Sequence, residues 1–409
     1  MQSISNHETL FLSHRILIIT THLVQYHAPL FEFLAGYGEY DLKVFYTSGK
    51  EDGASFDVGF GKKRSWNIDL LKGYKYEFLN NCAFDNKLTS FFSIVNPGII
   101  KKTAAYNPTL IIIFGWNYFS HLSMMLHYKG RIPVVFRGDS TSIDDSTANP
   151  LKLLLRYTML KCVYRYVDYV LSPGSASDAY FIKSGVTEKQ IIRSPHAVDN
   201  FRFAEFSTNE YDSLNLLKER LNINPNNLVF LFAGKFIDKK NPLLLIQAFN
   251  KVALKHDDVR LVMVGDGILE STIKTQISNL TDSIANRIHL FPFQDQHNIK
   301  LFYRLASVFV LPSKGPGETW GLSVNEALAS GTPVLVSSRC GCAHDLVQEG
   351  INGYLFKSDD LNDLESKMLL CCNEAHRKIL SGNAVQSIEN FSFQSIKESL
   401  DNIKNLIEE

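Results

Sequence analysis

The sequence predicts an α/β protein made of two Rossmann-like domains, each built on a parallel sheet. Short apolar runs rich in β-branched residues alternate with longer helical patterns along the chain. The alternation breaks near residues 195–203 and then starts again, which is typical of a connection between domains. The length of 409 residues is enough for two domains with full cores.

The expected strands are apolar runs bounded by turn residues, as in buried parallel sheets. In the first half they are Arg15–Thr20, Leu42–Thr47, Tyr76–Leu79, Thr109–Phe114, Pro133–Arg137, Tyr169–Ser172 and Ile191–Ser194. In the second half they are Leu228–Ala233, Val259–Val264, Ile288–Phe291, Val308–Leu311, Pro333–Val336 and Tyr354–Phe356. Helices are expected between them, and residues 55–64, which follow neither period, are expected to form an exposed loop.

Three segments follow from this alternation. Residues 1–198 are expected to form an N-terminal Rossmann-like domain, and residues 199–385 a second one. Residues 386–409 are expected to form a C-terminal helix that packs back across both domains.

The charge of the chain bears on its possible partners. The formal net charge is zero, so nothing in it points to nucleic acid, although residues 1–200 carry an excess of four positive charges. That basic half fits either an ordinary solvated surface or peripheral contact with an anionic membrane. The helical pattern of residues 151–167 leaves the same two interpretations open, a sheet-covering helix or one lying on a bilayer.

Cysteine usage and hydropathy suggest a cytoplasmic protein, with peripheral membrane contact as the alternative location. The six cysteines have no regular spacing and make a poor disulfide framework, and no zinc pattern appears. We expect no secretory signal, because the first fourteen residues carry acidic Glu8 and two histidines ahead of the apolar run. We expect no membrane span, because no apolar stretch is long enough.

Residues 311–336 hold the strongest candidate for a ligand site. A loop rich in glycine and proline follows an apolar run, and Gly321 then opens a helix. Glu318 stands before this helix and Glu326 inside it, eight positions apart. Loop amides and a helix N-terminus attract an anion, and carboxylates accept hydrogen bonds from hydroxyls. This layout predicts a site for a phosphorylated sugar.

Further candidates follow from the rule that parallel sheets bind ligands beyond the carboxyl ends of their strands. Lys235 and Lys240 could neutralise a diphosphate whose charge grows as a sugar leaves it, or they could be solvated loop lysines. In the first half the strand-end residues are Gln25, Tyr26, His27, Asn117, Arg137 and Asp139. Asp139 could take a proton from an incoming hydroxyl, with Arg137 positioning it, although a helix cap is the commoner role.

Other catalytic motifs are missing from the sequence. The dinucleotide fingerprint fails because Glu270 stands where its third glycine belongs, which disfavours a nicotinamide dehydrogenase. There is no P-loop, no nucleophile elbow and no D-x-D motif for a metal. We therefore expect neither a metal site nor a cofactor besides a donor substrate.

Several short motifs occur together in the second half: Gly234-Lys235-Phe236 with Lys240, Val264-Gly265-Asp266-Gly267, Pro312-Ser313, Glu318-x7-Glu326-Ala327 and Gly331-x-Pro333-Val334. This combination resembles the E-x7-E signature of family 4 glycosyltransferases of the bacterial type. There are departures, because Lys235 stands where Arg is more usual, Trp320 where Phe is common, and Pro292 where Gly is common. The paired glycines often seen after the first strand are also absent, and His27 stands nearby.

The resemblance implies the GT-B fold, in which two Rossmann-like domains face a central cleft, and a retaining, metal-independent sugar transfer. Glu318 and the backbone amides of Thr319, Trp320, Gly321 and Leu322 would hold the donor sugar, Lys235 and Lys240 the diphosphate, and Glu326 the ribose. Gly234, Gly265, Asp266 and Phe293 would complete the donor side. Gln25, Tyr26, His27, Asn117 and Arg137 would lie on the acceptor side.

The expected function is therefore transfer of a sugar from a nucleotide-diphosphate donor to a glycan or lipid-linked acceptor, in the synthesis of a cell-surface polysaccharide or glycolipid. Two alternatives remain open. A sugar-nucleotide epimerase can use the same fold, and a non-catalytic protein could bind the donor without turning it over.

Overall fold

The computed structural model describes residues 14–49, 55–57, 62–64, 69–84 and 88–409. The chain divides into two compact units. The first takes in residues 1–53, 70–137 and 165–170, and the second takes in residues 54–69, 138–164 and 171–409. The central cleft and the domain boundaries expected from the sequence stay predictions.

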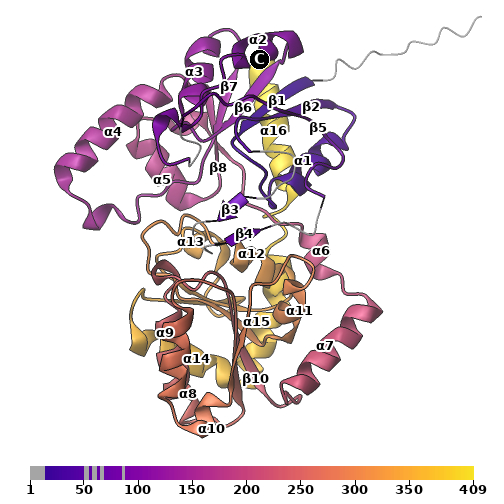
Figure 1. Cartoon of the computed structure of the whole chain (residues 1–409), viewed down its shortest axis with the longest axis vertical. Helices are drawn as coiled ribbons and strands as arrows, with labels where there is room; N and C mark the ends of the chain where they lie inside the picture. The colour runs from indigo at the N-terminus through magenta and orange to yellow at the C-terminus, as the bar shows by residue number, and fades with distance from the viewer. Residues whose placement is uncertain (1–13, 50–54, 58–61, 65–68, 85–87) are drawn as a thin grey trace, which may run out of the picture. The chain divides into compact units, whose positions relative to one another are not determined.

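Each expected apolar run lies on a strand, and the strands form one sheet of seven and one of six (Figure 1). The seven-stranded sheet has the order β5-β2-β1-β6-β7-β8-β9. Its strands are β1 (His14–Thr20), β2 (Tyr40–Tyr46), β5 (Lys75–Phe78), β6 (Leu110–Phe114), β7 (Val134–Arg137), β8 (Tyr169–Ser172) and β9 (Ile191–Arg193).

The six-stranded sheet lies in the second unit and has the order β12-β11-β10-β13-β14-β15. Its strands are β10 (Leu228–Ala233), β11 (Val259–Val264), β12 (Ile288–Phe291), β13 (Val308–Leu311), β14 (Val334–Ser337) and β15 (Gly353–Phe356). All five neighbouring pairs of this sheet are parallel. The parallel α/β architecture predicted from the alternating runs is confirmed.

Helices connect the strands, as parallel pairing requires. They are α1 (Ala28–Ala35), α2 (Ile99–Tyr106), α3 (Phe119–Tyr128), α4 (Pro150–Tyr164), α5 (Ser175–Lys183), α6 (Asn200–Ala204), α7 (Thr208–Arg220), α8 (Pro242–Ala253), α9 (Glu270–Ser278), α10 (Asp282–Ala285), α11 (Ile299–Leu305), α12 (Leu322–Ala329), α13 (Ala343–Leu346), α14 (Leu361–Cys372), α15 (Glu374–Ser387) and α16 (Phe393–Glu408). Short 3-10 turns are η1 (Phe91–Ser93), η2 (Asp145–Thr147), η3 (Glu188–Gln190) and η4 (Asp238–Lys240).

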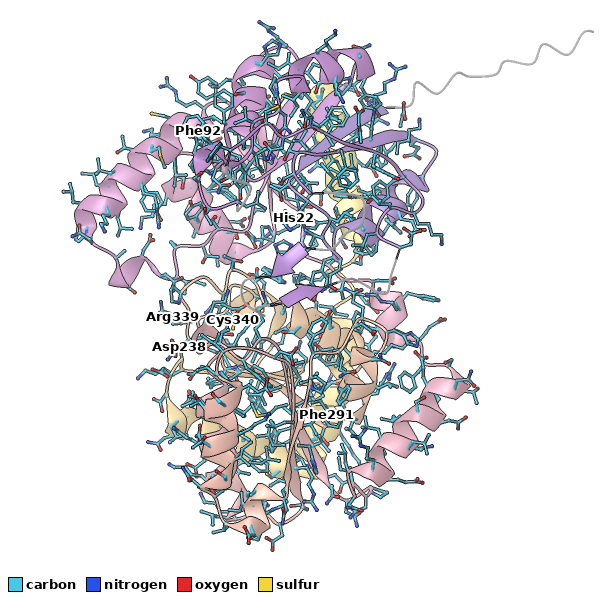
Figure 2. The ribbon with its side chains drawn as sticks, in the orientation of Figure 1. His22, Phe92, Asp238, Phe291, Arg339 and Cys340 are labelled. Atoms are coloured by element: carbon cyan, nitrogen blue, oxygen red, sulfur yellow. The ribbon has the colours of Figure 1, made fainter. Side chains whose placement is uncertain are left out.

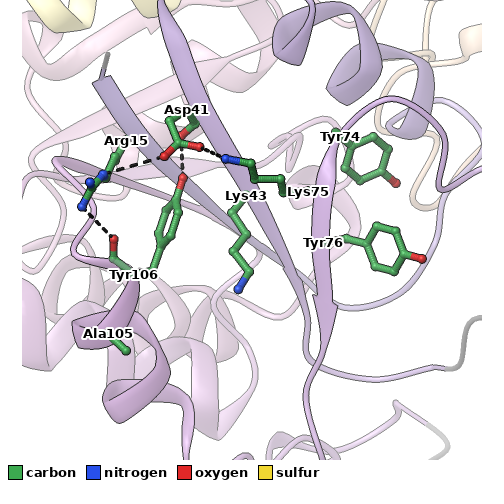
Figure 3. A pocket seen from close by; sticks show the side chains of 8 residues that line it. All are labelled: Arg15, Asp41, Lys43, Tyr74, Lys75, Tyr76, Ala105 and Tyr106. Atoms are coloured by element: carbon green, nitrogen blue, oxygen red, sulfur yellow. Dashed lines mark hydrogen bonds and ion pairs between the residues drawn. The ribbon is translucent and has the colours of Figure 1, made fainter. Parts of the chain in front are cut away.

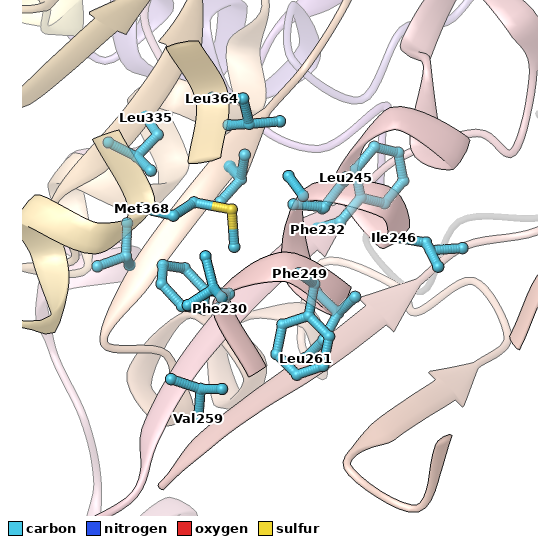
Figure 4. Close-up of a cluster of buried hydrophobic side chains, with 14 of the residues drawn as sticks. Phe230, Phe232, Leu245, Ile246, Phe249, Val259, Leu261, Leu335, Leu364 and Met368 are labelled. Carbon is cyan, nitrogen blue, oxygen red and sulfur yellow. The ribbon is translucent and has the colours of Figure 1, made fainter. Parts of the chain in front are cut away.

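The core of the second unit forms where α8 and α14 pack on the sheet (Figure 4). β10 contributes Phe230 and Phe232, α8 contributes Leu245 and Phe249, and α14 contributes Met368, all buried. Strands β10 and β13 are buried along their whole length, which explains why their sequences are continuous apolar runs rather than alternating patterns. This core fixes the strand ends from which the candidate site loops leave.

The expectation of a plain loop over residues 55–64 is wrong. This segment contains β3 (Ser55–Asp57) and β4 (Lys62–Arg64), which pair antiparallel, while residues 58–61 between them lie outside the described residues. Strands of three residues are too short for a two-residue period to stand out in the sequence.

The C-terminal helix α16 ends the chain with its buried side, notably Ile396, Leu400 and Ile403, turned into the protein. The Ser399 hydroxyl donates to the Arg193 carbonyl at 2.7 Å, which ties α16 to β9. Within the described ranges, we find no helix with both the length and the apolar composition that crossing a bilayer would require.

His121, on α3, is a fully buried titratable group of the first unit. Its Nδ1 lies 2.9 Å from the Gly115 carbonyl oxygen and its Nε2 lies 2.8 Å from Thr47 Oγ1. Burial lowers the pKa of His121 to about 4 against the opposing effect of its backbone hydrogen bonds. The ring is therefore neutral in the folded protein at pH 7.

This burial predicts a loss of stability in acid. The unfolded chain binds a proton on His121 below about pH 6.5 while the folded chain does not, so the free energy of unfolding should fall as the pH drops toward 4. At about pH 5 the contribution lost is roughly 2 kcal/mol relative to pH 7. Urea unfolding of wild type and His121→Gln should show the wild-type advantage shrinking by that amount. An advantage that is constant with pH would contradict the assignment.

Candidate functional site

The candidate site is built from loops at the carboxyl ends of the strands of the second sheet. The loop after β10 carries Lys235 and the turn η4, and the loop after β13 runs from Pro312 to Gly321, where α12 begins. Because β10 and β13 are neighbours, their loops leave the sheet side by side. The Lys314 amide donates to the Lys239 carbonyl at 2.9 Å, which joins the two loops directly.

Glu318 and Lys240 form the centre of this site. Lys240 Nζ lies 2.7 Å from Glu318 Oε2, and the Ser313 hydroxyl donates to the same oxygen at 3.1 Å. Only 7% of the Glu318 side chain and 15% of the Lys240 side chain are exposed. Burial alone would raise the pKa of Glu318, but the charges of Lys240 and Lys239 and the hydrogen bonds from Lys240 and Ser313 lower it. Glu318 is therefore an ionised carboxylate next to a cation.

Lys239 adds positive charge at the same place, although its ammonium group is also used structurally. It donates to the Gly317 carbonyl at 2.6 Å and so holds the loop that precedes Glu318. Lys235, which the sequence singles out with Lys240, is half-buried at the end of β10. The two lysines thus belong to one loop, and Lys240 is the one that contacts Glu318.

Glu326 lies inside α12 and is buried, as the apolar residues around it predict. The Tyr303 hydroxyl, from α11, donates to Glu326 Oε2 at 2.7 Å. Tyr303 is itself fully buried, and no motif in the sequence marks it as a site residue. A carboxylate inside a helix needs such a donor to be buried without a large cost.

The start of α12 is shaped by Gly321, which has φ of 111°, a left-handed conformation that favours glycine. The first amides of the helix follow at Leu322, where they have no intrahelical acceptor and can face an anion. Trp320 points elsewhere, since its indole Nε1–H donates to Asn325 Oδ1 at 2.8 Å and its side chain is 3% exposed. Its contribution to a ligand is thus limited to the backbone.

The remaining donor-side candidates hold neighbouring loops close together. A Cβ on Gly265 would lie 1.9 Å from the Gly234 carbonyl oxygen, so the β10 and β11 loops touch through these two glycines. The Phe293 amide donates to Asp266 Oδ1 at 3.3 Å, which joins the loops after β11 and β12. The structure therefore places Gly234, Gly265, Asp266 and Phe293 at contacts between adjacent loops.

Asp139 contacts this region as well. The Thr319 hydroxyl donates to Asp139 Oδ2 at 2.8 Å, and His196 Nε2 lies 3.6 Å from the same oxygen. Burial would raise the pKa of Asp139, but the hydrogen bond and charge of His196 and the hydrogen bond from Thr319 lower it well below its ordinary value. A carboxylate with such a low pKa is a weak base, which disfavours the proton-accepting role that the sequence suggested.

The loop after β14 closes the site on another side, and Figure 2 labels Arg339 and Cys340 within it. Arg339 Nη2 lies 2.5 Å from Asp144 Oδ1, and the other carboxylate oxygen accepts from the Gly317 amide at 2.7 Å. Burial raises the pKa of the thiols of Cys340 and Cys342, so both stay protonated. All six cysteines of the chain are free.

The acceptor-side candidates all lie in the first unit. Gln25, Tyr26 and His27 form the turn before α1, Asn117 follows β6, and Arg137 ends β7. The ring of Phe114 lies between two of them, with the His27 ring centroid 4.9 Å away and the Arg137 guanidinium 5.9 Å away. Oε1 of Gln25 is buried, and among the residues that the structure describes it has no hydrogen-bond partner.

A hollow of about 630 Å³ lies elsewhere in the first unit (Figure 3). It is lined by Arg15, Asp41, Lys43, Tyr74, Lys75, Tyr76, Ala105 and Tyr106. Its cations are already paired, since Asp41 binds Arg15 and Lys75, and Glu77 binds Lys43. It also opens at the amino ends of its strands, where parallel sheets do not place ligands.

No group of three or more His, Cys, Asp or Glu side chains within the described part of the chain is arranged to hold a metal ion. The metal and cofactor expectations stay predictions.

Gly341 offers a test of how the site loops are held. Its amide donates to the Glu318 carbonyl at 2.9 Å, and a Cβ on Gly341 would lie 1.7 Å from the Thr319 carbonyl oxygen. We expect Gly341→Ala to push the Glu318 loop away and to lower the free energy of unfolding by about 1–3 kcal/mol.

Gly382 is the matched control, because it lies in α15 with no atom within 4 Å of its missing Cβ. Gly382→Ala should raise the free energy of unfolding by about 0.5–1 kcal/mol, as for any glycine in a helix interior. Denaturant titration measures both variants. Equal effects of the two substitutions would show that the Gly341 contact does not constrain the loop.

Comparison with known proteins covers the part of the chain that carries most of these loops. Residues 215–385 match the family described as glycosyl transferases group 1. An uncharacterized glycosyltransferase of Methanocaldococcus jannaschii is 28% identical over 230 residues, which cover 56% of this chain and 62% of that protein. The alpha-monoglucosyldiacylglycerol synthase of Streptococcus pneumoniae is 28% identical over 252 residues, which cover 58% of this chain and 54% of that protein. The aligned segments thus span less than two thirds of either relative.

Solved structures resemble nearly the whole chain. The HepE protein of Anabaena, crystallised with UDP and glucose, is 19% identical with a TM-score of 0.68, and the match covers 96% of this chain and 99% of HepE. WaaG, a glycosyltransferase of lipopolysaccharide biosynthesis, is 14% identical with a TM-score of 0.66, covering 95% and 99%. The chain therefore has the GT-B fold, and residues 215–385 within it match the glycosyl transferases group 1.

Proposed function

We propose that this chain is a retaining glycosyltransferase that moves a sugar from a nucleotide-diphosphate donor to an acceptor hydroxyl. One observation carries the proposal. The buried Glu318 carboxylate lies 2.7 Å from Lys240, in a loop that leads into the N-terminus of α12. A carboxylate, a cation and a helix N-terminus at one place match the hydroxyls and the diphosphate of a nucleotide sugar.

The donor would bind with its charged centre at the lysines. Lys240 and Lys239 both act on Glu318 electrostatically, so an incoming diphosphate would meet positive charge that is already in place. Lys240 would then share its hydrogen bonds between the diphosphate and Glu318, which would accept hydrogen bonds from the sugar. HepE was crystallised with UDP and glucose, which supports a donor of this class.

Glu326 would bind the ribose. Tyr303 donates to one carboxylate oxygen and holds the side chain in one orientation, which prepares it for two neighbouring hydroxyls. The family match covers α11, α12 and the loops after β10 to β14, which is the part of the chain that would contact the donor.

Transfer would follow attack on the same face of the sugar from which the diphosphate leaves, through an oxocarbenium-like state. The bond from the anomeric carbon to the diphosphate breaks as the bond to the acceptor oxygen forms, and the acceptor proton passes to a departing phosphate oxygen. Such a path needs no protein base, in line with the low pKa of Asp139. Lysines at the diphosphate stabilise the growing charge more in the transition state than in the ground state. We propose that they, rather than a metal ion, supply this stabilisation.

The acceptor is proposed to be a glycan or lipid-linked hydroxyl in the synthesis of a cell-surface polysaccharide or glycolipid. Relatives named as a lipopolysaccharide 1,2-N-acetylglucosaminetransferase and an alpha-monoglucosyldiacylglycerol synthase support this class. The five acceptor-side candidates of the first unit would bind it.

Two substitutions test the charged centre. Glu318→Gln and Lys240→Met should each lower kcat/KM by at least about a hundredfold, because each removes a charge that the transition state needs. Nucleotide release from UDP-, GDP-, ADP- and dTDP-sugars in the presence of acceptor measures the effect.

A matched pair of controls lies on α8 and α14, where Lys251 Nζ is 3.1 Å from Glu365 Oε2. Lys251→Met and Glu365→Gln remove the same groups and should leave kcat/KM within about twofold, since the other partners of this pair, Asn362 and Lys255, lie away from the site loops. Circular dichroism checks that all four variants are folded. Turnover at the wild-type rate by Glu318→Gln or Lys240→Met would contradict the assignment.

The stereochemistry of the product tests the reaction type separately. We expect the transferred sugar to keep the anomeric configuration that it has in the donor, which proton NMR of the isolated product reads directly. Incubating the donor without acceptor should leave the sugar itself unchanged. An inverted product would refute a retaining path, and an altered sugar would favour the epimerase.

A further inference from the structure

The helix α4 (Pro150–Tyr164) exposes an unusual apolar face. Leu151, Leu154 and Leu155 are exposed by 65%, 64% and 63%, and Met159 by 48%. The opposite side of the helix is an ordinary packed one, since Leu160, Val163 and Tyr164 are buried. The exposed leucines are therefore additional to the side chains that attach α4 to the protein.

Lysines border this face on both sides. With 3.6 residues per turn, Leu154, Leu151, Leu155 and Met159 cover an arc of about 140°, with Lys161 at one edge and Lys152 at the other. Both lysines are exposed, and α4 contains no acidic residue. We call these six residues the α4 outer face.

The cation that does take part in packing is separate from this face. Arg156 pairs with Asp145, which also binds Lys183 at 2.7 Å and accepts a hydrogen bond from Tyr157. This cluster fixes the inner side of α4 to η2 and α5. Asp145 therefore neutralises Arg156 and Lys183, and not the lysines of the outer face.

We propose that the α4 outer face docks on the surface of an anionic lipid bilayer. A helix with leucine and methionine in the centre and lysines at the edges can bury its apolar side chains at the acyl boundary while the lysines reach the headgroups. Anionic lipids attract each lysine that lies near the surface. A second copy of this chain fits less well, because pairing two such faces would bring lysines of like charge together.

The proposal rests on α4 and not on the transfer reaction, so it can succeed or fail independently of the proposed function. It would place the enzyme at the surface that carries a lipid-linked acceptor.

Vesicle sedimentation tests the docking with the full chain and no sugar substrate. We expect binding to vesicles of equal parts phosphatidylglycerol and phosphatidylcholine, and at least about tenfold weaker binding to phosphatidylcholine alone or in high salt. Leu151→Ser/Leu155→Ser should reduce binding to the anionic vesicles by at least about tenfold, because two apolar side chains that would be buried in the bilayer are lost. Lys152→Glu/Lys161→Glu should weaken this binding by a similar factor, because the two reversed charges are repelled by the anionic headgroups.

Two control variants match these changes elsewhere on the surface. Leu216 on α7 and Leu254, directly after α8, are exposed by 66% and 70%, so Leu216→Ser/Leu254→Ser should bind as wild type does. Lys101→Glu/Lys189→Glu repeats the change in net charge at exposed positions outside α4 and should weaken binding less than Lys152→Glu/Lys161→Glu. The thermal midpoint of each variant checks that it is folded.

Three outcomes would overturn the proposal: wild-type binding that is equal for neutral and anionic vesicles, no vesicle binding at all, or equal losses in the control and outer-face variants. Light scattering tests the other possible occupant of this face, a second copy of the chain. If wild type is a dimer and Leu151→Ser/Leu155→Ser is a monomer, the face joins two copies instead.

Discussion

The candidate site depends on keeping a charged carboxylate buried. Glu318 is ionised and almost fully enclosed, which would be costly without Lys240 at 2.7 Å and the Ser313 hydroxyl at 3.1 Å. Removing one partner of such a pair leaves the other as an uncompensated buried charge. Lys240 and Ser313 thus hold the Glu318 carboxylate in place, so the charges of the candidate site are preorganised.

The loops around this pair are held by close backbone contacts rather than by side-chain packing. The Thr319 carbonyl lies so close to Gly341, and the Gly234 carbonyl so close to Gly265, that a Cβ atom on either glycine would clash with it. Asp144 joins the loops after β13 and β14 a second time, by accepting from the Gly317 amide while pairing with Arg339. The carboxyl ends of β10, β11, β13 and β14 are therefore linked into one framework, and the core beneath fixes its position.

Charge is used in two different ways in the second unit. Neighbouring cations and a hydroxyl lower the pKa of the buried Glu318 carboxyl, and His196 and Thr319 lower that of the half-exposed Asp139 carboxyl, so both acids are ionised but weakly basic. That suits binding and electrostatic stabilisation better than proton transfer. On α4 the lysines stay exposed at the edges of an apolar face, which suits an extended anionic surface rather than a single small ion.

The parallel α/β architecture can be predicted from the sequence alone, and the site residues are selected from it as a prediction. Continuous apolar runs such as Leu228–Ala233 predict buried parallel strands, because a strand whose two faces are both buried does not alternate polar and apolar residues. Parallel sheets bind ligands beyond the carboxyl ends of their strands, and this rule selects Lys240 and Glu318 as candidates. The side-chain contacts of these residues are seen only in the folded protein. Tyr303 reaches Glu326, His196 reaches Asp139, and Trp320 turns to Asn325. These partners lie far apart in sequence or follow no helical or strand period. Their contacts depend on how whole helices, strands and loops pack, which local sequence patterns do not predict.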